Sequence, residues 1–160
     1  MRIGVVSDTH GHVPFTLAAI ERLRCEQVAC VLHCGDIGTP AIVPLFEPWP
    51  TYFVLGNVDA PFELSRAILD AGQRYHGRFG ELEFLGVKIA LLHGDDGELL
   101  RNTIDSRAWN VVCHGHTHVA RRDQVGPTLV LNPGAVYRAS PRSLATLDLE
   151  TLAVVHHPLE

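Results

Sequence analysis

Histidine, aspartate and asparagine gather in five short clusters between residues 8 and 118. The clusters read Asp8-Thr9-His10, Gly35-Asp36, Gly56-Asn57, His93-Gly94 and Gly115-His116-Thr117-His118. Together they supply two carboxylates, one amide oxygen and four imidazoles, on Asp8, Asp36, Asn57, His10, His93, His116 and His118. Nitrogen and oxygen donors without thiolate suit Mn, Fe, Zn, Ni or Co better than Ca or Mg. The set is too large for one tetrahedral zinc, so it predicts two divalent ions that share a bridging carboxylate.

Each cluster comes directly after a short apolar run that is typical of a buried strand. These runs are residues 3–6, 28–32, 52–55, 87–92 and 111–113. In open α/β sheets, ligands bind just beyond the carboxyl ends of the strands. We therefore expect the five clusters to converge on one crevice.

The segments between the runs predict an α/β fold with parallel strands. Helical spacing marks residues 13–23, 40–46 and 97–107, and residues 78–84 and 87–92 form a hairpin around Gly86. The remaining chain reads as β structure, with residues 121–125 and 128–131 flanking a turn, and residues 144–149 and 152–156 flanking another. No repeat or linker divides the chain, so we expect a single domain over residues 1–160.

Composition excludes several classes of protein. Hydrophobic residues make up 46% and charged residues 19%, enough for a core and too little charge for a disordered chain. The formal net charge of −5 argues against dedicated nucleic-acid binding, but leaves a small, nucleotide-like phosphate ester open as substrate. The sequence has no signal segment, no apolar run of about 18 residues and no Cys-x-x-Cys pair, so we expect a cytoplasmic protein with reduced thiols and no membrane contact. The hydrophobic share leaves room for a homo-oligomer, although nothing locates an interface.

In this order, the five clusters resemble the signature of the calcineurin-like metallophosphoesterases: D-x-H, G-D, G-N-H, a lone G-H or H-G, and G-H-x-H. The resemblance runs from residue 5 to about residue 135. The small size and the stretch Leu131-Asn132-Pro133-Gly134 resemble the compact bacterial and archaeal phosphodiesterase branch of that family. This branch is also similar to the retromer subunit that uses the fold as a protein scaffold. The resemblance implies a four-layer α-β-β-α sandwich with two mixed β-sheets and the metals at its rim.

The resemblance also implies how the ions are held. The first ion would be bound by Asp8, His10, Asp36 and His118, and the second by Asp36, Asn57, His93 and His116. Asp36 would then bridge two ions, for which Mn²⁺ is our first expectation, and a bridging hydroxide would attack phosphorus in line. Two divalent ions, two aspartates and one hydroxide leave a net charge of about +1, which favours a phosphate anion.

The sequence departs from the family signature at Gly56-Asn57-Val58-Asp59, where Val58 replaces the usual histidine. That histidine protonates the leaving group or steadies the transition state, and valine can do neither. The compact branch often lacks it too. His12 and Asp59 are candidate substitutes, and we count both, with Asp36, Asn57 and His93, among the catalytic residues.

Other polar residues have structural interpretations. We expect His33 to be a buried, hydrogen-bonded residue and Cys34 to serve packing rather than nucleophilic attack. Thr9, Thr117 and Asn132 are expected to support the metal loops through hydrogen bonds.

Three functions remain open. The first is a phosphodiesterase, preferred over a phosphomonoesterase because no arginine clamp for a doubly charged terminal phosphate is evident. The second is a catalytically weak scaffold on the same fold, which predicts missing ligands or a large exposed apolar patch. The third is a mononuclear hydrolase that acts on a bond other than a phosphate ester. With a single ion, Asn57 and the second imidazole pair would have no metal to bind.

Overall fold

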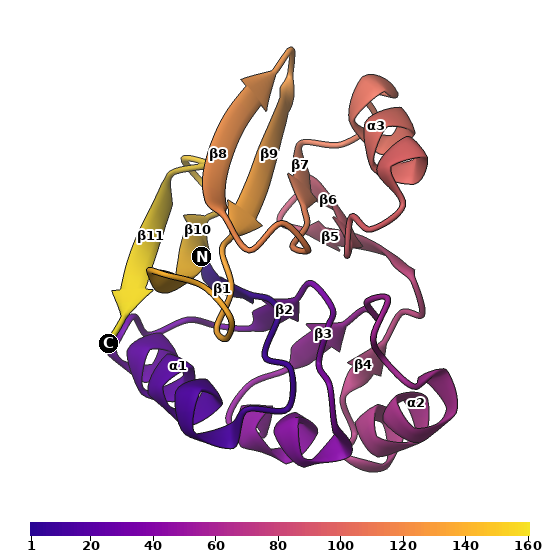
Figure 1. Cartoon of the computed structure of the whole chain (residues 1–160). Helices are drawn as coiled ribbons and strands as arrows, with labels where there is room; N and C mark the ends of the chain where they lie inside the picture. The colour runs from indigo at the N-terminus through magenta and orange to yellow at the C-terminus, as the bar shows by residue number, and fades with distance from the viewer.

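Two stacked β-sheets form the centre of the molecule (Figure 1), and the computed structural model describes residues 1–160. The first sheet contains β1 (Arg2–Val6), β2 (Val31–His33), β3 (Thr51–Phe53), β4 (Arg74–Tyr75), β10 (Arg142–Asp148) and β11 (Val154–Leu159). The second contains β5 (Phe79–Phe84), β6 (Val87–Leu92), β7 (Val111–Cys113), β8 (Ala120–Val125) and β9 (Thr128–Pro133).

Both sheets are mixed. The first has the order β11-β10-β1-β2-β3-β4, in which β1 to β4 are parallel and β10 runs antiparallel to both β1 and β11. The second has the order β5-β6-β7-β9-β8, with a parallel centre of β6, β7 and β9 and antiparallel edges. The predicted hairpins, β5–β6, β8–β9 and β10–β11, are therefore confirmed.

Helices cover the outer faces of the two sheets (Figure 1). The α1 helix (Val13–Cys25), the 3₁₀ helix η1 (Pro40–Phe46) and α2 (Pro61–Asp70) pack on the first sheet, and α3 (Gly97–Asp105) packs on the second. The four-layer α-β-β-α sandwich implied by the resemblance is thus confirmed.

Most of the apolar core lies in two layers. Sixteen buried residues fill the space between the sheets, and eighteen fill the space between the first sheet and its helices. Strand β1 serves both layers, because Ile3 and Val5 face the second sheet while Val6 faces the helices. Strands buried on both faces read as continuous apolar runs, which is why the sequence predicted them.

The sequence analysis did not predict two elements, α2 and β4 (Arg74–Tyr75). The α2 helix begins at Pro61 after Ala60, which offers no side-chain cap, and only Leu64 and Ile68 are buried. The two-residue strand β4 is too short to show a pattern. The helix predicted at 40–46 is present but forms a 3₁₀ helix with Pro44 inside it, and the helix predicted over 97–107 ends at Asp105.

All four cysteines are free, as the sequence predicted. Cys34 is fully buried, and burial raises the pKa of its thiol well above the usual value, which supports a packing role. No helix in the chain has the length and apolarity required to cross a lipid bilayer.

The ring of His33 is fully buried at the end of β2, as expected. Its Nδ1 accepts the Gly35 N–H at 3.2 Å, so the neutral ring carries its proton on Nε2, 3.1 Å from the Thr9 hydroxyl. The Thr9 hydroxyl donates in turn to the Ile37 carbonyl. Burial, together with the nearby His93, lowers the pKa of His33 to about 3.

This buried histidine predicts a loss of stability in acid. The unfolded chain takes up the His33 proton near pH 6.5, whereas the folded protein resists it down to about pH 3, so stability is full above pH 6.5 and falls below it. We expect His33 to remove about 2 kcal/mol of unfolding free energy between pH 7 and pH 5.

Urea unfolding of the metal-free protein measures this effect. The variant His33→Gln keeps a donor for Thr9 but does not titrate. The difference in unfolding free energy between wild type and variant should therefore be about 2 kcal/mol smaller at pH 5 than at pH 7. A gap that is the same at both pH values would contradict the assignment.

Candidate metal centre

The carboxyl ends of β1, β2, β6 and β7 meet where the two sheets adjoin. The loops after these strands are joined by backbone hydrogen bonds, from Asp8 N to the Gly35 carbonyl at 3.0 Å and from Gly115 N to the His93 carbonyl at 2.9 Å. The His116 N–H crosses from one sheet to the other and donates to Asp8 Oδ2 at 3.2 Å. Segments more than 100 residues apart in sequence are therefore held together at one edge.

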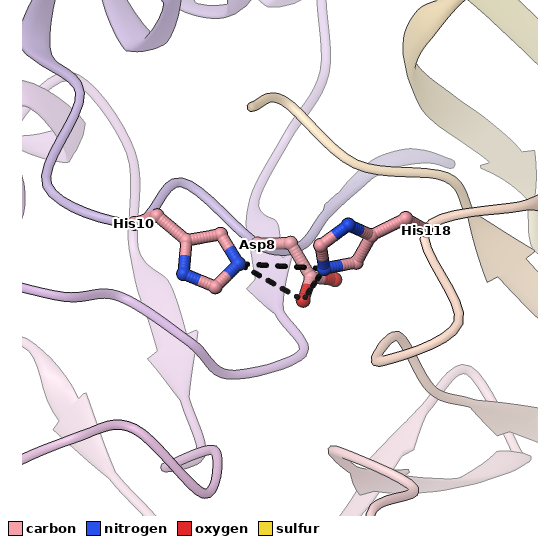
Figure 2. Close-up of side chains that lie close together, drawn as sticks. All are labelled: Asp8, His10 and His118. Atoms are coloured by element: carbon pink, nitrogen blue, oxygen red, sulfur yellow. Dashed lines mark hydrogen bonds and ion pairs between the residues drawn. The ribbon is translucent and has the colours of Figure 1, made fainter. Parts of the chain in front are cut away.

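Asp8, His10 and His118 form the first group of converging donors (Figure 2). Asp8 Oδ1 lies 3.1 Å from His118 Nε2 and 3.7 Å from His10 Nε2, and the two Nε2 atoms are 3.4 Å apart. Two imidazole nitrogens and one carboxylate oxygen thus face a common point, as ligands of one cation do.

Asp8, Asp36 and His93 form the second group. His93 Nε2 lies 3.3 Å from Asp36 Oδ2, and the same oxygen lies 3.7 Å from His10 Nε2 of the first group. A single Asp36 oxygen therefore lies near a nitrogen from each group. This position suits a carboxylate shared by two cations.

Backbone carbonyls orient two of the imidazole rings. His93 Nδ1 is 2.8 Å from the Cys34 carbonyl, and His118 Nδ1 is 3.1 Å from the Arg138 carbonyl. Because a carbonyl only accepts, each Nδ1 must carry a proton, and the neutral ring then has its lone pair on Nε2. Nε2 is the atom that faces the aspartates, so both rings are held in the tautomer that binds metal through Nε2.

Two buried polar atoms in the cluster have no hydrogen-bond partner, namely Asp8 Oδ1 and His93 Nε2. Both lie within about 3.3 Å of a polar atom of another residue, but the groups are not aligned for hydrogen bonding. An unpaired buried carboxylate oxygen is costly, and a bound cation removes that cost. The nitrogen and oxygen donors present therefore fit divalent transition-metal ions.

Burial and the mutual attraction of aspartates and histidines act in opposite directions on the pKa values of the cluster. Burial alone would raise the pKa of Asp36, but the adjacent His93 outweighs it and the pKa is lowered. Burial would likewise lower the pKa of His93, but Asp36 and Asp8 outweigh it and the pKa is raised. For His10, burial prevails over the two aspartates and lowers the pKa. The negative charge of Asp36 is thus maintained, and its attraction falls chiefly on His93.

Several of these side chains stand on left-handed backbone, which is uncommon outside glycine. Positive φ angles, between 45° and 67°, occur at Asp8, His10, Asp36, His116 and His118. Such conformations cost free energy and persist only where surrounding contacts hold them. Gly56 and Gly115 provide some of that room, because a Cβ on Gly56 would collide with Asp36 and one on Gly115 with Ser7 and Asp8.

The remaining predicted ligands lie beside these two groups. The His116 ring is exposed and packs edge-on against His93, with ring centres 5.1 Å apart. Asn57 is exposed on the turn after β3, where the next residue, Val58, donates its N–H to Asp36 Oδ1 at 3.2 Å. No hydrogen bond or ion pair joins the Asn57 side chain to the cluster, so its role as a ligand stays a prediction.

The two proposed proton donors make structural contacts. The Asp59 carboxylate is buried and accepts three backbone N–H groups, from Ile37 at 3.1 Å and from Gly38 and Gly56 at 2.8 Å. His12 caps α1 by accepting the Phe15 N–H on Nδ1. These contacts hold the loops around Asp36 and His10, and a part in proton transfer remains a prediction for both residues.

Hydrogen bonds from Asn132 support the loop that carries His116 and His118, as predicted. The Asn132 amide donates to the Gly115 carbonyl at 2.9 Å and to the Thr117 hydroxyl at 3.0 Å, and its oxygen accepts the Gly134 N–H at 2.9 Å. All polar atoms of this buried side chain are therefore engaged.

The sequence analysis missed two residues beside the cluster, Tyr137 and Arg138. The Tyr137 N–H donates to the Asp8 carbonyl at 3.0 Å, and its ring centre lies 6.5 Å from that of His10. Arg138 supplies the carbonyl that orients His118. Neither residue belongs to a motif, and the loop that positions them follows β9, so no sequence signal could have identified them.

Comparison with known proteins identifies the family. The profile of the calcineurin-like phosphoesterase superfamily domain matches residues 1–152. The chain belongs to this superfamily. The resemblance seen in the five clusters is thereby confirmed.

Relatives of this phosphoesterase span nearly the whole chain. Phosphodiesterase MJ0936 of Methanocaldococcus jannaschii is 32% identical over 156 residues, covering 94% of each protein. The probable metallophosphoesterase YsnB of Bacillus subtilis is 28% identical and covers 94% of this chain and 85% of its own length. The solved structure of an archaeal phosphodiesterase superposes with a TM-score of 0.91 at 31% identity, over 99% of this chain and 100% of the other. Vps29 of Entamoeba histolytica, solved with zinc, has a TM-score of 0.66 at 17% identity over 99% and 98% of the two chains, which shows a shared fold.

The support from Asn132 predicts a measurable effect on metal binding. We expect Asn132→Ala to weaken Mn²⁺ affinity by about 10- to 100-fold, because the loop carrying His116 and His118 loses two hydrogen bonds. Titration calorimetry with Mn²⁺ measures the change. Asn102→Ala on the exposed face of α3 is the matched control and should keep wild-type affinity. Equal affinities for the two variants would refute the supporting role.

Proposed function

We propose that this phosphoesterase is a phosphodiesterase that binds two divalent cations. The observation that carries the proposal is the convergence of two donor groups on Asp8 and Asp36, with Asp8 Oδ1 and His93 Nε2 buried and unpaired. Membership of the calcineurin-like phosphoesterase superfamily supports it.

In this proposal, the two ions are held by seven residues and share one carboxylate. The first set is Asp8, His10, Asp36 and His118, and the second is Asp36, Asn57, His93 and His116. When bound, such ions lower the pKa of a coordinated water and neutralise charge on the phosphoryl group. Two ions and two carboxylates leave a net charge of about +2, which attracts an anionic ester. Mn²⁺ is our first candidate, with Fe, Zn, Ni and Co as alternatives.

The neighbouring residues of the chain hold the metal ligands in position and do not themselves take part in bond breaking. The Cys34 and Arg138 carbonyls fix the His93 and His118 rings, so that Nε2 is presented without rearrangement. We assign Asp59 a positioning role, because its three backbone hydrogen bonds hold the Asp36 loop to the Asn57 turn. Catalysis then depends on preorganised charge more than on proton transfer from a side chain.

A diester is the preferred substrate class. The archaeal relative at 32% identity is named a phosphodiesterase, and the solved structure of an archaeal phosphodiesterase matches the fold over 99% of the chain. Assays of a bis-p-nitrophenyl diester and the corresponding monoester, with Mn²⁺, test this preference. We expect faster diester cleavage, no activity in EDTA, and about two metal equivalents per chain, falling to one or fewer in Asp36→Asn. Faster monoester cleavage would overturn the preference, and full activity in EDTA would overturn the metal mechanism.

Val58 predicts a dependence on the leaving group. Its apolar side chain is 52% exposed beside Asp36 and cannot donate a proton, so esters of poorly acidic alcohols should react slowly. We expect Val58→His to raise the kcat for an alkyl diester at least about tenfold while changing the nitrophenyl diester little, since only the alkyl alcohol needs protonation.

Val155→His is the matched control, because Val155 is 54% exposed on β11 in the first sheet. This variant should leave both rates unchanged. An alkyl rate that does not respond to Val58→His would show that protonation of the leaving group does not limit the reaction.

A further inference from the structure

A cavity of about 480 Å³ lies on the His10 and His118 side of the metal centre. Its walls come from the start of α1, the loop between β9 and β10 and the end of β11, and include Phe15, Tyr137, Arg138, Pro141, Arg142 and Leu159. Figure 1 shows this loop, in orange, descending from β9 toward the β1 and α1 side of the molecule. Ligand sites of proteins fall in this range of volumes, about 300–1,000 Å³.

The cavity and the metal centre share structural contacts. The Tyr137 N–H donates to the Asp8 carbonyl, and the Tyr137 ring packs edge-on to His10 with centres 6.5 Å apart. The Arg138 carbonyl accepts the His118 Nδ1 proton at 3.1 Å. A substrate held at the metal centre could therefore extend into the cavity.

The cavity contains two arginines that no carboxylate neutralises. Arg121 pairs with Asp123 and Arg78 pairs with Asp95, but neither Arg138 nor Arg142 forms an ion pair. Their guanidinium groups lie against aromatic rings instead, Arg142 at 3.5 Å from the centre of Phe15 and Arg138 at 5.7 Å from that of Tyr137. Arg142 Nη2 also donates to the Leu159 carbonyl at 3.5 Å. Contact with a ring face leaves the other N–H groups of a guanidinium available to an anion.

Two guanidinium groups that line one cavity without a counter-ion repel each other. An anionic group between them removes that repulsion, and arginine binds phosphate through paired N–H groups. The aromatic rings are less available, because His12 packs against Phe15 at 4.2 Å and against Tyr137 at 4.4 Å. The cavity therefore favours an anion over a stacked base.

We propose that the cavity lined by Arg138 and Arg142 is a subsite for a second phosphate group of the substrate. The preferred substrates are then phosphodiesters that carry a further phosphate beyond the scissile one, such as a nucleotide ester with a phosphate at its other end. The inference rests on the proposed function, which places the scissile phosphate at the metal centre. Arg138 and Arg142 are specificity residues in this account.

Binding of two nucleotides to the Mn²⁺-loaded protein tests the subsite without requiring turnover. Thymidine 5′-monophosphate and thymidine 3′,5′-bisphosphate differ only in the second phosphate. Calorimetry should show the bisphosphate binding about tenfold more tightly to the wild type, the effect of a charge-assisted hydrogen bond. Equal affinities, or no binding of either nucleotide, would overturn the proposal.

Variants of Arg138 test whether this side chain produces the difference in affinity between the two nucleotides. Arg138→Asn removes the charge at a residue type that tolerates the left-handed backbone found there, and should make the two affinities equal. Arg138→Lys keeps the charge and should retain most of the difference. Arg101→Gln changes net charge equally on the exposed surface of α3 and should retain all of it. If Arg138→Asn and Arg101→Gln keep the same difference, the cavity is not the subsite.

Hydrolysis separates this proposal from the proposed function. The p-nitrophenyl ester of thymidine 5′-phosphate, with and without a 3′-phosphate, is the substrate pair. Failure to cleave either ester would refute the phosphodiesterase proposal, while the calorimetric difference would still decide the subsite. Cleavage of both with equal KM would keep the enzyme and refute the subsite.

Discussion

Two buried aspartates, Asp8 and Asp36, lie among histidines at the junction of the two sheets. The rest of the site is arranged around the negative charge of these two carboxylates. Asp8 is fully buried and Asp36 nearly so, and each has an oxygen close to imidazole nitrogens from distant parts of the chain. Removing two carboxylates from water costs several kcal/mol each unless positive charge compensates it. Neutral histidines cannot supply that charge fully, so cations bound between the aspartates would lower the cost of burying them.

The surrounding loops maintain this arrangement against local strain. Five of the predicted site residues have left-handed backbone, and Asp59, Asn132 and Thr9 hold the loops that carry them through hydrogen bonds to backbone groups or neighbouring loop residues. A side chain on Gly56 or Gly115 would displace an aspartate or its neighbour, Ser7. Such preorganisation is useful in hydrolysis, because donors already in position need not be reoriented during the reaction.

The surroundings of the metal centre shape the chemistry available to it. Val58 places an exposed apolar side chain next to Asp36, the Tyr137 ring packs edge-on to His10, and the Arg138 carbonyl orients His118. A single helix, α3, covers the second sheet, whose edge strand β8 is largely exposed while the neighbouring β9 is buried throughout.

The sequence by itself determined every strand except the short β4, the five clusters and the chemistry of their donors. Strands buried on both faces leave continuous apolar runs, and polar residues after such runs are visible locally. Only the tertiary structure decided which carbonyls orient His93 and His118, that Asp59 accepts three backbone N–H groups, and that the Tyr137 ring packs against His10. All but one of these relations join residues about 20 or more positions apart through left-handed loops, and no local pattern of residue types encodes that geometry.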